Sequence, residues 1–290
     1  MLYGAIEAGG TKMVLAAGDE NGRILRRDTL PTLTPAETVP KMIAFFRETG
    51  IAALGVGCFG PLDLDAASPT YGYITATPKL AWRNYPILPV LQEALGVPCA
   101  LDTDVNAAAL CEARLGAARG VKNALYLTVG TGVGGGVYCE GRLVHGGMHP
   151  EWGHFLLRPR EDDPMPQGVC PYHAGCVEGL ASGPAMEKRW GVSAKELPAD
   201  HPAWDLEAYY LAQVCTVALM TLSTERIILG GGVMSQTRLF PLIRRKTAEM
   251  VNGYLSGCHA TVLEETIVPP ACFPDSGLVG SLLLGVEALR

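Results

Sequence analysis

Apolar runs of strand length alternate along the chain with glycine-rich turns and with longer helical stretches. In the first part of the chain this pattern predicts three strands, a helix, and two more strands separated by a second helix. Thr34 is suited to cap the first helix, and Pro35 is suited to its first turn. A further helix begins near Asp104. The predicted strands cover residues 2–7, 12–18, 23–30, 51–58 and 97–101, and the second helix covers 86–95.

The second part of the chain begins again with three strands and continues with alternating helices and strands. The helix over residues 204–223 is apolar on most faces, which predicts that it is buried. Residues 146–175 are irregular and rich in Gly, Pro, His and Cys. We interpret the chain as a duplicated α/β unit with a boundary near Ala117–Gly120. The strands cover 122–129, 134–140, 141–145, 226–229 and 266–268, and the other helices cover 239–251 and 276–289.

The composition is that of a globular protein with an acidic balance. The chain has 290 residues and a formal net charge of −6 at pH 7, with no basic run, so no nucleic-acid partner is expected. No apolar stretch reaches the roughly 18 residues of a membrane helix, so no membrane partner is expected. The nine cysteines are an odd number, and the N-terminus does not resemble a secretory signal. These features predict a cytoplasmic location with reduced thiols.

Two glycine-rich turns lie between strand-like runs, one near the start of each half. The first contains Gly9, Gly10, Thr11 and Lys12, and the second spans residues 130–136. Glycine allows a sharp bend and lets a ligand approach the main chain. Two such hairpins would hold a polyphosphate from both sides, whereas either one alone is better explained as a tight turn. The repetition favours a phosphate-binding function.

The glycine spacing of a dinucleotide site also occurs, from Gly55 to Gly60 and from Gly130 to Gly135. Such a site needs a helix directly after the glycines and an acidic residue about twenty positions later. A strand follows the second pattern, and the first has no acidic residue near position 80. Neither is therefore interpreted as a dinucleotide site.

The irregular segment contains the motif Cys170-x-x-His173-x-x-Cys176. Two thiolates and two imidazoles satisfy a tetrahedral Zn²⁺ ion, and a full set of four ligands predicts a structural site. A long irregular segment usually requires such a cross-link. Spacing leaves three candidates for the fourth ligand, namely His154, which is favoured, His149 and His145.

Three further features have both a structural and a chemical interpretation. Glu151 and Glu178 flank the His/Cys motif and are suited to bind sugar hydroxyls, but each alone is more simply a surface charge. Asp104, at a strand-to-helix junction, is first of all a helix cap, and it is also a candidate to accept a proton during phosphoryl transfer. The turn over residues 229–234 suits either contact with adenine and ribose or a plain connection.

Taken together, these segments resemble the ROK family (repressors, open reading frames and sugar kinases), and within it the bacterial fructokinases. The resemblance covers nearly the whole chain. The motifs occur in family order: EAGGTK at 7–12, FGPLD at 59–63, TDVNAAALCE at 103–112, GTGVGGG at 130–136, HPEWGH at 149–154, CPYHAGCVEGLASGPA at 170–185 and LGGGV at 229–233.

The resemblance implies an actin-like, hexokinase-type ATPase fold of two ribonuclease-H-like α/β domains around a cleft. The implied domains are residues 1–118, completed by the helix over 276–290, and residues 119–275, which include the zinc loop over 146–178. The implied activity is ATP-dependent phosphorylation of D-fructose to fructose 6-phosphate. A homodimer is also implied.

The resemblance assigns roles to individual residues. Asp104 matches the catalytic base, and Mg²⁺ would accompany ATP. The ATP phosphates would meet Gly9, Gly10, Thr11, Lys12, Thr131 and Gly132, and the adenosine Gly183, Pro184, Gly231, Gly232 and Met234. The sugar would contact Asn106, Glu151, His154 and Glu178, and zinc would be held by His154, Cys170, His173 and Cys176.

Three departures from the broader family favour its fructokinase branch. Glu7 stands where the first phosphate turn usually opens with Asp, Thr103 stands where Asn usually precedes the base, and the cysteine motif is the less common one. Kinases for glucose, mannose or N-acetylmannosamine stay open as alternatives, as does a non-catalytic sugar sensor. A repressor is not expected, because the first glycine turn begins at residue 7.

Overall fold

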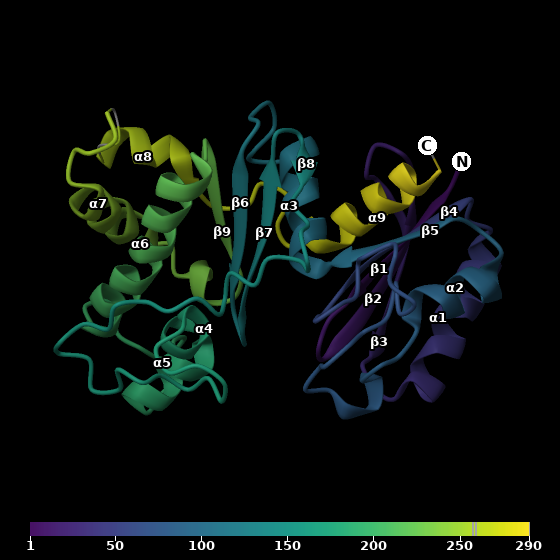
Figure 1. The fold of residues 1–290 in the computed structure, drawn as a ribbon, viewed down its shortest axis with the longest axis horizontal. Helices are drawn as coiled ribbons and strands as arrows, with labels where there is room; N and C mark the ends of the chain where they lie inside the picture. Colours follow the sequence, from purple (N-terminus) through teal and green to yellow (C-terminus); the bar gives the residue numbers. More distant parts are fainter. Residues whose placement is uncertain (257, 259, 290) are drawn as a thin grey trace. The chain divides into compact units, whose positions relative to one another are not determined.

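Each half of the chain contains a five-stranded sheet, and the two sheets have equivalent strand orders (Figure 1). The computed structural model describes residues 1–256, 258 and 260–289. The chain divides into two units. Unit 1 comprises Met1–Leu115, Arg142–Pro150 and Cys272–Arg290, and unit 2 comprises Gly116–Gly141 and Glu151–Ala271.

In unit 1, β1 (Tyr3–Ala8) is the central strand, antiparallel to β2 (Lys12–Gly18) and parallel to β4 (Ala53–Cys58). The edge strands are β3 (Ile24–Pro31) beside β2 and β5 (Cys99–Thr103) beside β4, in the order β3-β2-β1-β4-β5. The β1–β2 hairpin confirms the strand pair predicted around the first glycine turn.

Helices cover both faces of this sheet, which explains why its central strands are buried on both sides. On one face, α1 (Pro35–Thr49) and α2 (Ile87–Leu95) pack over a core that includes Ile6 and Met13. The N-terminus of α1 carries the predicted cap: Thr34 and Glu37 form a capping box, and Pro35 is the first helical residue. A short 3-10 helix, η1 (Leu80–Trp82), lies in the connection before α2.

On the opposite face, α9 (Ser276–Ala288) packs over β1 and β4 and alongside α3 (Asp104–Arg114). The close approach explains the glycines of β4. A Cβ atom at Gly55 would overlap the backbone of α9 at Ser281, and one at Gly57 would clash with the Ser281 hydroxyl. Two of the three glycines that imitate a dinucleotide site therefore serve helix–sheet packing.

Unit 2 repeats this topology. β6 (Ala124–Val129) is antiparallel to β7 (Val133–Cys139) and parallel to β9 (Arg226–Gly230). The edges are β8 (Arg142–Leu143), whose residues belong to unit 1, and β10 (Ile267–Val268), in the order β10-β9-β6-β7-β8. The second glycine turn thus also connects an antiparallel pair, as predicted.

The helices of unit 2 are partly those expected. α6 (Ala203–Leu222) is largely buried, as predicted, and packs against α7 (Leu239–Val251). The sequence did not predict α4 (Val177–Ala181), α5 (Gly183–Trp190) or α8 (Ala260–Thr266). A 3-10 turn, η2 (Val233–Ser235), follows β9.

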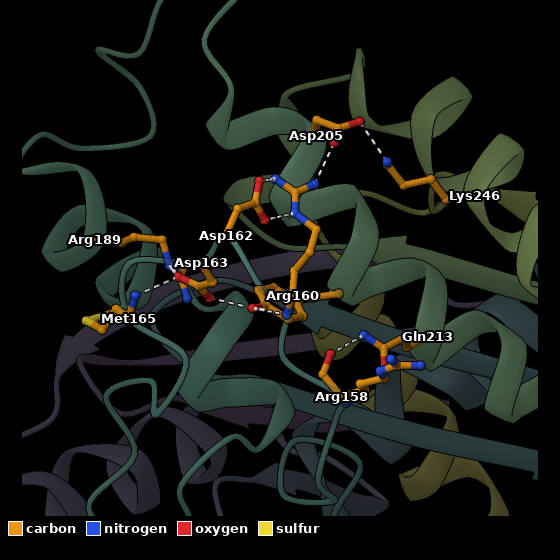
Figure 2. A network of polar contacts seen from close by, with 10 residues as sticks. Arg158, Arg160, Asp162, Asp163, Met165, Arg189, Asp205, Gln213 and Lys246 are labelled. Carbon is orange, nitrogen blue, oxygen red and sulfur yellow. Dashed lines mark hydrogen bonds and ion pairs between the residues drawn. The ribbon is translucent and has the colours of Figure 1, made fainter.

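A network of polar side chains fixes part of the irregular segment to the helices of unit 2 (Figure 2). Asp163 accepts hydrogen bonds from the Arg189 guanidinium of α5 at 2.8 Å and from the Tyr210 hydroxyl of α6. Nearby, Arg160 pairs with Asp205 of α6 at 2.6 Å. The Asp163–Arg189 pair is almost fully buried, with side chains 0% and 1% exposed.

We expect Asp163→Asn to lower the free energy of unfolding by about 3–5 kcal/mol, because it leaves the buried Arg189 cation without its counter-charge. Asp162→Asn is the matched control, since the Asp162 side chain is 68% exposed and its ion pair with Arg160 should contribute about 1 kcal/mol or less. Urea unfolding of both variants measures the difference. Equal losses would contradict the importance of the buried pair.

Candidate functional site

The first site element is the corner between β5 and α3 in unit 1. Thr103, the last residue of β5, caps the helix, because its Oγ1 accepts a hydrogen bond from the Asn106 backbone N–H at 3.1 Å. Asp104 is the first helical residue, and its Oδ1 accepts from the Val105 N–H at 2.9 Å. Since Thr103 is the cap, Asp104 is not required for that role. A carboxylate in the first turn is stabilised by the helix dipole.

Beside Asp104 lies a buried polar cluster. Asp102, 4% exposed, accepts from the Thr103 N–H at 2.8 Å and from Asn106 Nδ2 at 2.7 Å through Oδ1. Its Oδ2 lies 2.8 Å from His145 Nε2. This hydrogen bond raises the pKa of His145 above its ordinary value, against the opposing effect of burial. The sequence did not identify Asp102 and His145 as a pair, because 43 positions separate them.

The first glycine turn lies elsewhere in unit 1, between β1 and β2. The Gly9 N–H donates to the Lys12 carbonyl at 3.0 Å, and the Thr32 hydroxyl donates to the Gly9 carbonyl at 2.8 Å. Gly10, Thr11 and Lys12 are exposed. The turn is thus fixed at its base and accessible at its tip, as a phosphate-binding turn must be.

Glu7, the residue that departs from the usual Asp, lies on β1 next to this turn. A Cβ atom added to Gly277, in the first turn of α9, would lie 2.8 Å from a Glu7 carboxylate oxygen. Burial raises the pKa of Glu7, and the Lys12 ammonium lowers it in part. The longer side chain therefore packs against the start of α9 and excludes a larger residue there.

In unit 2, three of the predicted nucleotide-binding segments lie together. The Gly130 N–H donates to the Gly132 carbonyl at 2.9 Å, and the Gly183 N–H donates to the Gly130 carbonyl at 2.8 Å. Gly231 has a φ of 89°, and a Cβ atom there would overlap Val129. The turns that contain Thr131, Gly183 and Gly231 therefore lie next to one another in unit 2. The first glycine turn belongs to unit 1.

The predicted sugar-binding residues are also divided between the units. Glu178, on α4, accepts from the Val133 N–H at 3.0 Å, next to the second glycine turn. Glu151 is exposed, and its carbonyl accepts from the His154 N–H at 3.0 Å. Asn106, in unit 1, is only 1% exposed. Glu178 and His154 are thus held in unit 2, whereas Asn106 is buried at the α3 corner.

Four residues of unit 2 form a candidate metal centre. The ligand atoms of His154, Cys170, His173 and Cys176 all lie within 4.8 Å of one another. His154 Nδ1 is 4.0 Å from Cys170 Sγ and 3.9 Å from Cys176 Sγ. Bonds of about 2.0–2.3 Å to a central ion place tetrahedral ligands at nearly these separations. The donor set and its geometry therefore fit Zn²⁺.

The metal centre is continuous with α4. Cys176 is the N-cap of that helix, where its Sγ accepts from the Gly179 N–H at 3.3 Å. Burial raises the pKa of the Cys176 thiol to about 11, so a metal ion must displace its proton when it binds. Because Glu178 follows two residues later, the position of its carboxylate depends on the same turn.

The other two histidines considered as fourth ligands have different partners, both in unit 1. His149 is 3% exposed, and its Nε2 accepts from the Leu62 N–H at 3.0 Å. His145 pairs with Asp102. These contacts also explain why residues 142–150 group with unit 1, whereas the sequence placed them in the second domain.

The repeated α/β topology of the two units is that of an actin-like ATPase fold. Sugar kinases with this fold are the class to which the glycine turns, the carboxylate at the start of α3 and the His/Cys centre point. The model of the ROK family matches residues 3–287, and the chain belongs to that family. The ROK hexokinase of Thermus thermophilus has the same fold, with a TM-score of 0.80 and 29% identity over 100% of this chain and 99% of its own. Among the helices described, none has the length and apolar character to cross a membrane.

Curated relatives cover the full length of the chain. A fructokinase of Pediococcus pentosaceus is 43% identical over 100% of this chain and 99% of its own length. A fructokinase of Zymomonas mobilis is 43% identical over 99% of this chain and 97% of its own length. The likeness therefore includes both units and every segment of the candidate site.

Proposed function

We propose that this protein is a fructokinase, which transfers the γ-phosphoryl group of ATP to the 6-hydroxyl of D-fructose. The observation that carries the proposal is the 43% identity to fructokinases along the whole chain. The geometry supports it, because phosphoryl transfer to a sugar needs a carboxylate near the reacting hydroxyl, backbone N–H groups for the phosphates and side chains for the sugar. Asp104, the two glycine turns and the pair Glu178 and His154 are candidates for these parts.

In the proposed reaction, Asp104 accepts the proton of the 6-hydroxyl. The hydroxyl oxygen forms a bond to the γ-phosphorus while the bond between that phosphorus and the bridging oxygen breaks, and ADP leaves. N–H groups at Gly9–Lys12 and at Thr131–Gly132 stabilise charge on the phosphates. Mg²⁺ bound with ATP supplies further neutralisation of this charge. Little covalent chemistry is required of the protein, so positioning dominates the catalysis.

The other contacts are proposed on the same basis. Gly183, Pro184, Gly231, Gly232 and Met234 bind the adenosine. Asn106, Glu151, His154 and Glu178 form the sugar site, and His154 also belongs to the zinc centre. Zn²⁺ is structural, because four protein ligands leave no open position for chemistry. We also propose a cytoplasmic homodimer.

Release of ADP from Mg-ATP tests the function, with fructose, glucose, mannose, N-acetylmannosamine and no sugar compared side by side. We expect turnover with fructose to exceed that with each other sugar by about 100-fold or more, as expected when a buried hydrogen bond to one hydroxyl decides specificity. Faster turnover on another sugar would support the assignment as a sugar kinase and reject fructose as its substrate. Absence of turnover on every sugar, in zinc-loaded protein, would favour a sensor.

A further inference from the structure

The Asp102 carboxylate next to the proposed catalytic base is buried, so its hydrogen bonds must be satisfied within the protein. Two of its donors, the Thr103 N–H and Asn106 Nδ2, come from the same β5–α3 corner. The third, His145 Nε2, comes from the segment after β8. His145 is therefore the donor that reaches this corner from a distant part of the chain.

The chemistry of a carboxylate settles which atom donates. An ionised carboxylate only accepts hydrogen bonds, so the His145 nitrogen that faces Asp102 must carry a proton. The same argument fixes the Asn106 amide: its Nδ2 faces Asp102, and its Oδ1 must point away. Asn106 Nδ2 and His145 Nε2 are 3.5 Å apart, so both donors converge on one carboxyl group.

The Asn106 Oδ1 atom that results from this arrangement is buried and has no hydrogen-bond partner among the described residues. An orphaned buried oxygen costs about 1–3 kcal/mol, so this orientation of the amide depends on the hydrogen bond from its Nδ2 to Asp102. Asp102 also contacts the start of α3 directly, because its Oδ1 accepts from the backbone N–H of Thr103, the residue that caps this helix. Asp104 lies between Thr103 and Asn106.

We infer that His145 is a positioning residue for phosphoryl transfer. Its hydrogen bond holds Asp102, and Asp102 in turn holds the Thr103 N–H and the Asn106 amide. These two residues flank Asp104, so the first turn of α3 presents Asp104 in one orientation. His145 itself contacts neither ATP nor sugar in this scheme. The inference rests on the proposed function for its catalytic consequence, but the positioning of Asn106 can be measured separately.

His145→Ala should lower kcat with fructose by about 10- to 100-fold, the cost of a displacement of about 1 Å at the reacting groups. KM for ATP should stay unchanged, because the proposed adenosine contacts belong to unit 2, whereas His145, Asp102 and Asn106 belong to unit 1. His145→Gln should restore kcat to near the native value, since the Gln amide nitrogen takes the place of imidazole Nε2. Rates are normalised to the fraction of protein that binds a non-hydrolysable ATP analogue, which corrects for misfolding.

A purely structural role would give a different pattern. Normalised kcat for His145→Ala equal to that of the wild type would overturn the inference, and so would equal losses in the Ala and Gln variants. In an Asp102→Asn background, His145→Ala should cause no additional loss in kcat. An additional loss would mean that His145 acts by some route other than Asp102.

A measurement without turnover separates this inference from the proposed function. The chain has five asparagines, so selective ¹⁵N-Asn labelling gives five side-chain amide pairs in NMR spectra. The Asn106 pair should shift in His145→Ala and keep its native position in His145→Gln. An unmoved Asn106 pair in the Ala variant would overturn the positioning role, whether or not the wild type phosphorylates fructose. If the wild type is inert on all sugars but the Asn106 pair still shifts in His145→Ala, only the proposed kinase function is rejected.

Discussion

Asp104→Asn should reduce kcat with fructose by about 10²–10⁴-fold, the usual contribution of a general base. The amide has the size of the carboxylate and can still accept the hydrogen bond from the Val105 N–H, which lies 2.9 Å from Oδ1. It cannot accept the proton of the sugar hydroxyl. Fructose binding, measured calorimetrically, should therefore stay within about threefold of the native affinity while turnover is lost.

The alternative is that Asp104 serves only the helix dipole, which is worth about 0.3–1 kcal/mol. Glu37→Gln is the matched control, because Glu37 is the acidic residue in the first turn of α1, outside the site. Both variants should show similar small losses in stability. Only Asp104→Asn should lose turnover, and normal turnover in that variant would reject Asp104 as the base.

The features that could be predicted from the sequence are those that local chemistry determines. The capping box at Thr34 and Glu37 starts α1 at Pro35, as the residue types require. The β1–β2 and β6–β7 hairpins follow from apolar runs on either side of glycine turns. The short helices α4 and α5 could not be predicted, because five and eight residues carry too little periodicity for recognition.

Features that depend on distant residues were beyond local patterns. Spacing alone could not choose among three histidines for the metal centre. The structure selects His154 because His145 pairs with Asp102 and His149 accepts from Leu62. Likewise, Gly55 and Gly57 of β4 supply two of the three glycines of a dinucleotide-like pattern, and only the packing of α9 explains why they are glycines. A close contact across the fold leaves no signal in residue spacing.

Removal of the metal should weaken fructose binding much more than nucleotide binding. His154 is both a candidate ligand and a candidate sugar contact, and Cys176 caps the helix that carries Glu178. Without the ion, the coordination bonds that fix His154 and the start of α4 are lost, so the positions of His154 and Glu178 relative to each other are no longer fixed. We expect chelation or Cys176→Ser to raise KM for fructose by about 10- to 100-fold, as loss of groups that support a metal site does. KM for ATP should change by about twofold or less, since hydrogen bonds between Gly130, Gly132 and Gly183 fix that turn.

Removal of the metal should also lower the free energy of unfolding. An ion that binds only the folded state contributes about 4 kcal/mol when its free concentration is about 1,000 times Kd. Cys139→Ser is the matched control, because Cys139 is half-buried at the end of β7 and outside the cluster. Elemental analysis should find about one zinc per chain in the wild type and in Cys139→Ser, the stoichiometry of one four-ligand site, and little in Cys176→Ser.

The two effects of metal removal can be separated by temperature. Well below the unfolding transition of the metal-free protein, the chain is folded, so a change in fructose affinity reports the local geometry of His154 and Glu178. Native fructose affinity under those conditions would show that the centre supports only stability. A parallel loss of fructose and ATP affinity would instead indicate that the metal holds unit 2 as a whole. A loss confined to fructose is expected, because the cluster adjoins Glu178 through Cys176, and the buried Asp163–Arg189 pair fixes the rest of the segment independently.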